Sequence, residues 1–350
     1  MSPPPCASRR RKKIWAGTKA SARTSSGNGR TTSSVFSTGD AAHPASPCCF
    51  GGLAAAAVAR MIRPDRAWAA IAPVAHKVGN IEVMIVSDGV LNVPLSFSLP
   101  ETPLSEAAAL FKAHGMPEGG EPVQTNVVLV KTGNDTVLID VGSGANFQPT
   151  AGKLQENLEA AGIAPDTITK VVFTHAHADH LWGVLDDFDD AERFPNASYV
   201  ISAPEWDFWS NPATVETVPD WLKGMALGTA RILKKIEDKV ERRKAGDTVA
   251  PGLTYAATPG HTPGHMSVMI ENGGQRLMIG GDVLANNAIS FARPDWRIGS
   301  DFDRDRAAAT RKSLLDQLAA GKIPLVGFHL AWPGLGMVER AGNAYRLVPL

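Results

Sequence analysis

From about residue 76 onward, apolar residues occur in two patterns: short continuous runs and positions at helical spacing. Short apolar runs predict strands at 81–86, 126–130, 136–139, 171–173, 266–270, 276–279 and 323–326. Apolar residues at helical spacing predict helices at 105–114, 153–161 and 305–320. Strand pairs followed by a helix occur twice, which predicts two packed sheets with helices on their outer faces.

Small and polar residues mark the ends of several of these elements. Gly133-Asn134-Asp135 and Asn272-Gly273-Gly274 are turn sequences, so the strands on either side of each are expected to form hairpins. Ser105 is the expected N-cap of the first helix. Gly162 and Gly321 are expected to end the other two helices.

Residues 213–244 are expected to form a helical insertion between the two halves of this domain. Ala230, Leu233, Ile236 and Val240 fall on one helical face, and Lys, Arg and Glu side chains occupy the rest. This pattern is typical of an amphipathic helix with one solvated face. A lid over a site, or a surface for a partner, is the alternative.

The first 75 residues have a different composition and are expected to be a disordered or targeting segment. Residues 1–48 are rich in Ser, Thr, Gly, Pro, Arg and Lys and lack apolar periodicity. An apolar run at 50–59, followed by the small residues Ala67-Trp68-Ala69, resembles an export signal. Arginines interrupt this stretch, and translation from Met61 is the alternative. Export to the periplasm and a cytoplasmic location therefore both remain open.

The charge and the cysteine content limit the kinds of molecule that this domain is expected to bind. Of the 35 basic and 35 acidic residues, 24 Lys/Arg and 33 Asp/Glu fall in 76–350, so this part of the chain is acidic. Nucleic-acid-binding domains usually carry the opposite charge, which argues against a nuclease. All three cysteines lie in the first fifty residues, so the domain has no thiolate ligand. No apolar stretch reaches the length of a membrane span. We expect a small-molecule substrate and neither a nucleic-acid nor a membrane partner; a homodimer remains open.

The chemistry is concentrated in Thr174-His175-Ala176-His177-Ala178-Asp179-His180, which directly follows the apolar strand 171–173. Three imidazoles and a carboxylate within six residues are costly to bury together without a cation. Such ligands suit zinc and also iron, manganese or cobalt. Three later positions carry the same ligand types after strand-like runs: His261 with nearby His265, Asp282 and His329.

These motifs, in this order, resemble the metallo-β-lactamase superfamily over roughly residues 78–340. The resemblance implies a four-layer αββα sandwich, with residues 76–350 as the catalytic domain and two divalent metal ions, zinc being expected, at one edge of the sheets. It assigns His175, His177 and His261 to one metal and Asp179, His180 and His329 to the other, with Asp282 bridging both. It also implies that Asp140 orients a ligand histidine. His265 is expected to support the site without binding a metal.

The mechanism implied by this resemblance is attack on the substrate by a hydroxide that bridges the two metals. Asp179 and Asp282 are the expected catalytic carboxylates. Either the second metal stabilises the leaving oxygen, or Asp179 or a water protonates it. The sequence does not decide between these routes.

Within the superfamily, the segment from His329 to Gly336 is similar to the methyl parathion hydrolase-like branch, as are Trp182 and a predicted long hairpin over 88–99. That branch implies hydrolysis of carboxylic esters, lactones or phosphotriesters. Small acyl-homoserine lactonases, an alternative, carry a Tyr three residues after the bridging Asp, where this chain has Ala285. A nuclease of the same fold and a metal-binding interaction protein without catalysis are further alternatives.

Aromatic residues near the motifs are expected to line the pocket: Phe97, Trp182, Phe291, Trp296, Phe302 and Trp332.

Overall fold

The computed structural model describes residues 70–350, apart from residues 121 and 187. The predictions for residues 1–69, including the export signal, lie outside the described residues. The first strand begins at Val74, two residues before the boundary predicted at residue 76.

The N-terminal half of the described chain forms a seven-stranded sheet in simple chain order. Its strands are β1 (Val74–Val78), β2 (Ile81–Leu91), β3 (Val123–Thr132), β4 (Asp135–Ile139), β5 (Lys170–Val172), β6 (Ser198–Ser202) and β7 (Val240–Arg243). The first four are paired antiparallel and the last four parallel, β4 belonging to both groups. The predicted hairpin around Gly133 is therefore confirmed.

The C-terminal half forms a second seven-stranded sheet, also in simple chain order. Its strands are β8 (Thr248–Ala250), β9 (Leu253–Ala257), β10 (Met266–Asn272), β11 (Gln275–Ile279), β12 (Pro324–Val326), β13 (Leu335–Ala341) and β14 (Ala344–Pro349). Only β11 and β12 run parallel. The predicted hairpin β10–β11 is confirmed, with Val268 opposite Ile279.

The two sheets pack face to face because their strands alternate apolar side chains between two cores. In β2, Val83 and Ile85 point into the core between the sheets, whereas Val86 faces the outer helices. The hydroxyl of Tyr255 crosses from the second sheet and donates to the Phe173 carbonyl at 2.7 Å. This contact ties the second sheet to the loop that follows β5.

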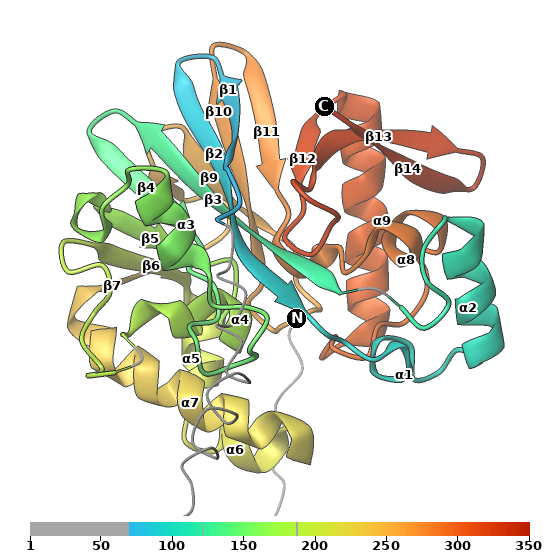
Figure 1. Cartoon of the computed structure of the whole chain (residues 1–350), viewed down its shortest axis with the longest axis horizontal. Coiled ribbons are helices and arrows are strands. Elements are labelled where there is room, and N and C mark those ends of the chain that lie inside the picture. The colour runs from blue at the N-terminus through green and yellow to red at the C-terminus, as the bar shows by residue number, and fades with distance from the viewer. Residues whose placement is uncertain (1–69, 121, 187) are drawn as a thin grey trace, which may run out of the picture. The chain divides into compact units, whose positions relative to one another are not determined.

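Helices cover both outer faces, as Figure 1 shows. Helices α3 (Leu154–Ala160), α5 (Ala203–Trp209) and α7 (Asp220–Ile236) bury their apolar residues against the first sheet. Helix α9 (Arg304–Gly321) packs Leu314, Leu315 and Leu318 against the second sheet. The predicted αββα sandwich is confirmed.

The structure corrects two predicted helix boundaries. Helix α2 (Leu104–Ala113) begins after Pro103, so Ser105 lies inside the helix instead of capping it. Pro103 occupies the N-cap position and offers no side-chain acceptor, so no side chain caps this end of the helix. Helix α9 includes Gly321, and the left-handed residue that ends it is Lys322, with φ 48°.

Two further segments also differ from the prediction. The long hairpin expected over 88–99 does not form: β2 runs to Leu91, and the chain then enters the short helix α1 (Leu95–Ser98). The insertion contains α6 (Thr214–Thr217) and α7, but Val240 belongs to strand β7 and not to the helical face. Val240 is extended because it pairs with Tyr199 of β6 at the edge of the sheet. A helical spacing of apolar residues in the sequence does not reveal such a pairing.

Across the described residues, no helix combines the length and the apolarity that a bilayer crossing requires.

Candidate metal centre

The residues of this site come from loops at one edge of the two sheets. The loop after β5 carries His175 and His177, and the one-turn helix α4 (Ala178–Leu181) that follows carries Asp179 and His180. His261 lies in the loop before β10, Asp282 in the 3-10 turn after β11, and His329 in the loop after β12. The structure therefore brings together all seven residues predicted as metal ligands.

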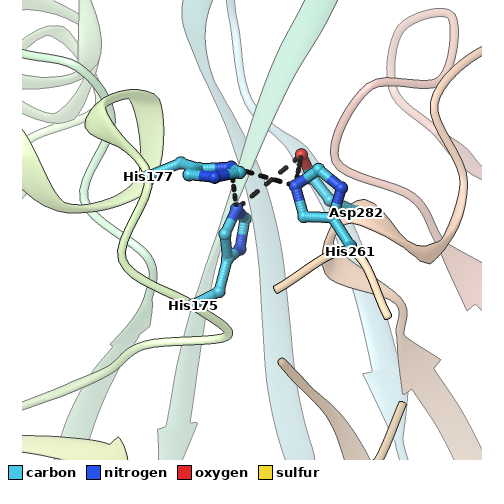
Figure 2. Close-up of side chains that lie close together, drawn as sticks. All are labelled: His175, His177, His261 and Asp282. Carbon is cyan, nitrogen blue, oxygen red and sulfur yellow. Dashed lines mark hydrogen bonds and ion pairs between the residues drawn. The ribbon is translucent and has the colours of Figure 1, made fainter. Parts of the chain in front are cut away.

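Four of these side chains form a first group, shown in Figure 2. His175 Nε2 and His261 Nε2 each lie 3.0 Å from His177 Nδ1. His261 Nε2 also lies 3.3 Å from Asp282 Oδ2. Three ring nitrogens pointing at one another cannot all be satisfied by sharing protons, whereas a cation between them would accept every lone pair.

A second group of four shares Asp282 with the first. His180 Nε2 lies 3.1 Å from Asp282 Oδ1, and His329 Nε2 lies 3.0 Å from Asp282 Oδ2. His329 Nε2 is also 3.3 Å from Asp179 Oδ2. In each group the four donor atoms lie within 4.8 Å of one another, so each could surround one metal ion.

Unsatisfied polar atoms show that these residues fit cations. Within the described part of the chain, the buried atoms His180 Nε2 and Asp282 Oδ1 have no hydrogen-bond partner, although they lie close together. A buried polar atom without a partner costs about 1–3 kcal/mol. A divalent cation in the second group would coordinate both atoms, and imidazole with carboxylate suits zinc, iron, manganese and cobalt alike.

The carboxylates make this centre strongly attractive to positive charge. Burial lowers the pKa of His261, but Asp282 and Asp301 together raise it to about 9. Burial likewise lowers the pKa of His329, yet Asp282 and Asp179 raise it to about 10. Imidazoles beside these carboxylates thus take up protons when no metal competes, and a bound metal would displace those protons.

Asp140 supports the second group from behind, at the end of β4. Its carboxylate accepts hydrogen bonds from Thr174 N, Thr174 Oγ1 and His180 Nδ1, each at 2.8 Å. Because His180 Nδ1 donates its proton to Asp140, His180 Nε2 is left with a free lone pair toward Asp282. This arrangement agrees with the orienting role expected for Asp140.

Replacing Asp140 by Asn is expected to weaken binding of the second metal by about 10- to 100-fold, because the amide is a poorer acceptor for His180 Nδ1. Titration of the metal-free protein with Zn²⁺ against a coloured chelator measures this change. Asp166→Asn, at an exposed position, is the matched control. Equal affinities in the two variants would refute the orienting role.

His265 lies next to the ligands but makes a different set of contacts. Its Nε2 accepts a hydrogen bond from the backbone N–H of Asp282 at 3.0 Å, and its Nδ1 pairs with Thr258 Oγ1 at 2.9 Å. Burial lowers the pKa of His265 to about 3, so the ring is neutral. His265 therefore positions the Asp282 turn, and both of its nitrogens are engaged away from the metal groups.

Three supporting residues were missed by the sequence reasoning. Asn126 Nδ2 donates to the carbonyls of Gly327 and Leu330, on either side of His329. Glu205 and Asp301 are buried carboxylates that contact the loops carrying the ligands. Each is a single polar residue in a different part of the chain, so no local motif could have revealed it.

A cavity of about 300 Å³ opens onto the two groups and reaches His177, Asp179, His261, Asp282 and His329. Its other walls are mostly apolar: Leu91, Val93, Pro94, Phe97, Val123, Phe147, Trp221, Met225, Ala285 and Ile298, with Asn92, Ser98, Gln148 and Ser300 as polar members. The rings of Phe97 and Trp221 meet edge to face at 4.9 Å. None of these described lining residues is Lys, Arg, Glu or Tyr.

Of the six aromatic residues expected to line the pocket, only Phe97 does so. The other five are elsewhere in the fold. Trp182 points at α7, where its Nε1 donates to Thr229, and Phe302 stacks on the His177 ring from a neighbouring cavity. Phe291 is buried against α9, Trp296 packs with α1, α2 and α8 (Asn287–Ala292), and Trp332 packs against the core between the sheets. Nearness in sequence to a metal ligand did not predict the direction of these side chains.

Comparison with known proteins agrees with this geometry. A family model described as the metallo-beta-lactamase superfamily matches residues 120–322. The probable metallo-hydrolase YqjP of Bacillus subtilis (strain 168) is 31% identical over 180 residues, which are 47% of this chain and 54% of the relative. The chain thus spans about half the length of that relative.

Two solved structures resemble the chain over most of its length. The dizinc quorum-quenching lactonase AidC, in complex with the product N-hexnoyl-L-homoserine, superimposes with a TM-score of 0.75 and 31% identity, covering 80% of this chain and 97% of AidC. The hydrolase AbOPH gives a TM-score of 0.74 and 27% identity, with 80% and 98% covered. The chain therefore belongs to the metallo-beta-lactamase superfamily, as one of its metal-dependent hydrolases.

Proposed function

We propose that this protein is a two-metal hydrolase of small, neutral ester-like substrates, with lactones as the leading class. The observation that carries the proposal is the cavity of about 300 Å³ that opens directly onto both groups of ligands and whose other described walls carry no charged side chain. Apolar walls favour an uncharged substrate, and the metal groups at one end would receive its ester oxygen. Similarity to a dizinc lactonase over 97% of that protein's length supports lactones in particular.

The residues have distinct roles in this proposal. His175, His177 and His261 would hold one cation, Asp179, His180 and His329 would hold the other, and Asp282 belongs to both groups. When bound, two divalent cations lower the pKa of water between them and polarise the substrate's ester oxygen. Asp179 lines the cavity, so its carboxylate can orient the attacking water and carry a proton toward the leaving oxygen.

Phosphotriesters are the second candidate class, through the methyl parathion hydrolase-like branch. The segment from His329 to Gly336, which resembles that branch, returns from the site between β12 and β13. Ala285 lines the cavity where small acyl-homoserine lactonases have a Tyr, so no phenol is available there to a leaving group. A substrate with a good leaving group needs less help of that kind.

Elemental analysis combined with a hydrolysis panel tests this function. We expect about two metal ions per chain and turnover of hexanoyl-homoserine lactone, p-nitrophenyl acetate or paraoxon. His177→Ala is expected to lose metal and to lower turnover by at least about 10²-fold, because it removes a ligand that faces the cavity. His114→Ala, at an exposed histidine, is the control.

Two outcomes would contradict the proposal. One metal per chain, or none, would refute the two-metal centre. Two metals without hydrolysis of any ester, lactone or phosphotriester would instead favour the interaction protein without catalysis. Single-stranded RNA and DNA in the same panel test the nuclease alternative, which the acidic domain argues against.

A further inference from the structure

We propose that Asp301, held in place by Arg311, is the positioning residue for His261 and so sets the affinity of the first metal group. The inference rests on the proposed two-metal function. It assigns a role to a buried ion pair that lies outside both groups of ligands.

Asp301 forms a direct link between the ligand ring and the buried arginine. Its Oδ1 accepts a hydrogen bond from His261 Nδ1 at 2.9 Å, and its Oδ2 accepts one from Arg311 Nη2 at 2.9 Å. Asp301 is 5% exposed and Arg311 is fully buried. Because Nδ1 of His261 donates to a carboxylate, its Nε2 keeps a lone pair directed at His177 and Asp282.

Arg311 is itself fixed by the surrounding backbone. Its Nε donates to the Val283 carbonyl at 2.9 Å, and its Nη1 donates to the carbonyls of Pro294 and Trp296, both at 3.0 Å. Val283 directly follows the shared ligand Asp282. One guanidinium, reaching in from α9, therefore holds the backbone next to Asp282 and the carboxylate behind His261 at the same time.

The backbone joins the same two segments. Phe302 N donates to the His261 carbonyl at 3.1 Å, and Asp303 N donates to the Gly260 carbonyl at 2.9 Å. Ile298 and Ser300, in the segment that Arg311 ties down, line the cavity. The placement of His261 is therefore coupled to one wall of the cavity.

Symmetry between the two groups strengthens the inference. Each group contains one histidine whose Nδ1 is bonded to a buried carboxylate: His180 with Asp140, and His261 with Asp301. Nδ1 of His175 contacts a hydroxyl and Nδ1 of His329 a backbone carbonyl, whereas His177 turns its Nδ1 toward the other ligands of its group. A carboxylate partner makes the ring more basic and fixes its angle, so each group has one strongly positioned ligand.

The test uses parent variants that each leave one group intact. His329→Ala retains the first group, and His177→Ala retains the second. Into each parent we introduce Asp301→Asn, which keeps the size of the side chain but loses the charge. Binding of Co²⁺ is measured by competition with a chelator and by the visible absorption of the bound ion, so the readout does not depend on activity.

In the His329→Ala parent, Asp301→Asn is expected to weaken Co²⁺ binding by about 10- to 100-fold and to change the absorption bands. In the His177→Ala parent it is expected to leave binding unchanged. Asp140→Asn is the matched control and should give the reverse pattern.

Equal weakening in both parents would overturn the inference, because it would show a general structural defect. No weakening in the His329→Ala parent would overturn it as well, while leaving the two-metal function intact. If neither parent binds Co²⁺ although each is folded by circular dichroism, the proposed function fails together with the inference.

Discussion

Replacing Asp282 by Ala is expected to abolish tight binding of both metal ions and to lower hydrolysis by at least about 10³-fold. Asp282 is the only residue common to the two groups of ligands among the described residues. Its Oδ1 approaches His180 and its Oδ2 approaches His261 and His329. Loss of this carboxylate therefore removes a ligand from each ion and the charge that holds them together.

Two measurements check this prediction. The metal content measured by elemental analysis should fall from about two ions per chain toward none. Added Zn²⁺ should raise the melting temperature of the wild type, because it binds only the folded state, and should leave that of Asp282→Ala nearly unchanged. Glu271→Ala, an exposed carboxylate at the end of β10, is the control. A variant that keeps one tightly bound ion would show that Asp282 serves only one group.

Replacing Glu205 by Ala is expected to destabilise the fold by about 4 kcal/mol, the largest stability effect that we predict. Glu205 is fully buried at the start of α5. Its Oε1 accepts hydrogen bonds from Ala176 N and Trp209 Nε1, and its Oε2 accepts them from Thr262 Oγ1 and Gly264 N. Removal of the carboxylate leaves four buried donors without an acceptor.

Glu205 also determines how two ligand loops sit relative to each other. Ala176 lies between His175 and His177, and Thr262 follows His261, so the carboxylate joins the loops that carry the first metal group. A Cβ atom at Gly264 would lie 2.2 Å from Glu205 N, so only glycine permits this approach. We therefore expect Glu205→Ala to weaken metal binding as well as to destabilise the fold.

Thermal unfolding in excess chelator isolates the stability effect, with an expected fall in melting temperature on the order of 10 °C. The melting temperature of Glu205→Gln should fall less, because the amide oxygen still accepts hydrogen bonds from some of the four donors. Glu216→Ala, at an exposed position on α6, is the control. A melting temperature within about 1 °C of the wild type would show that these four hydrogen bonds do not hold the loops.

The sequence alone was sufficient to predict the features that are encoded within a few neighbouring residues. Short apolar runs on either side of turn sequences predicted the hairpins β3–β4 and β10–β11, because a tight turn and the strands beside it lie within a few residues of one another. Four predicted metal ligands lie within six residues, so their chemistry was visible before their positions were. His261, Asp282 and His329 were placed by family resemblance, and the structure brings them to the same edge.

Only the tertiary structure decided which residues support the ligands and which line the cavity. Asp301 acts on a histidine 40 residues away, Glu205 on a threonine 57 residues away and Asn126 on a carbonyl 201 residues away. Trp182 follows the ligand motif but turns toward α7, whereas Trp221 on that same helix faces the cavity. Hydrogen bonds and side-chain directions of this kind depend on how distant segments pack, and no pattern within a short window records that packing.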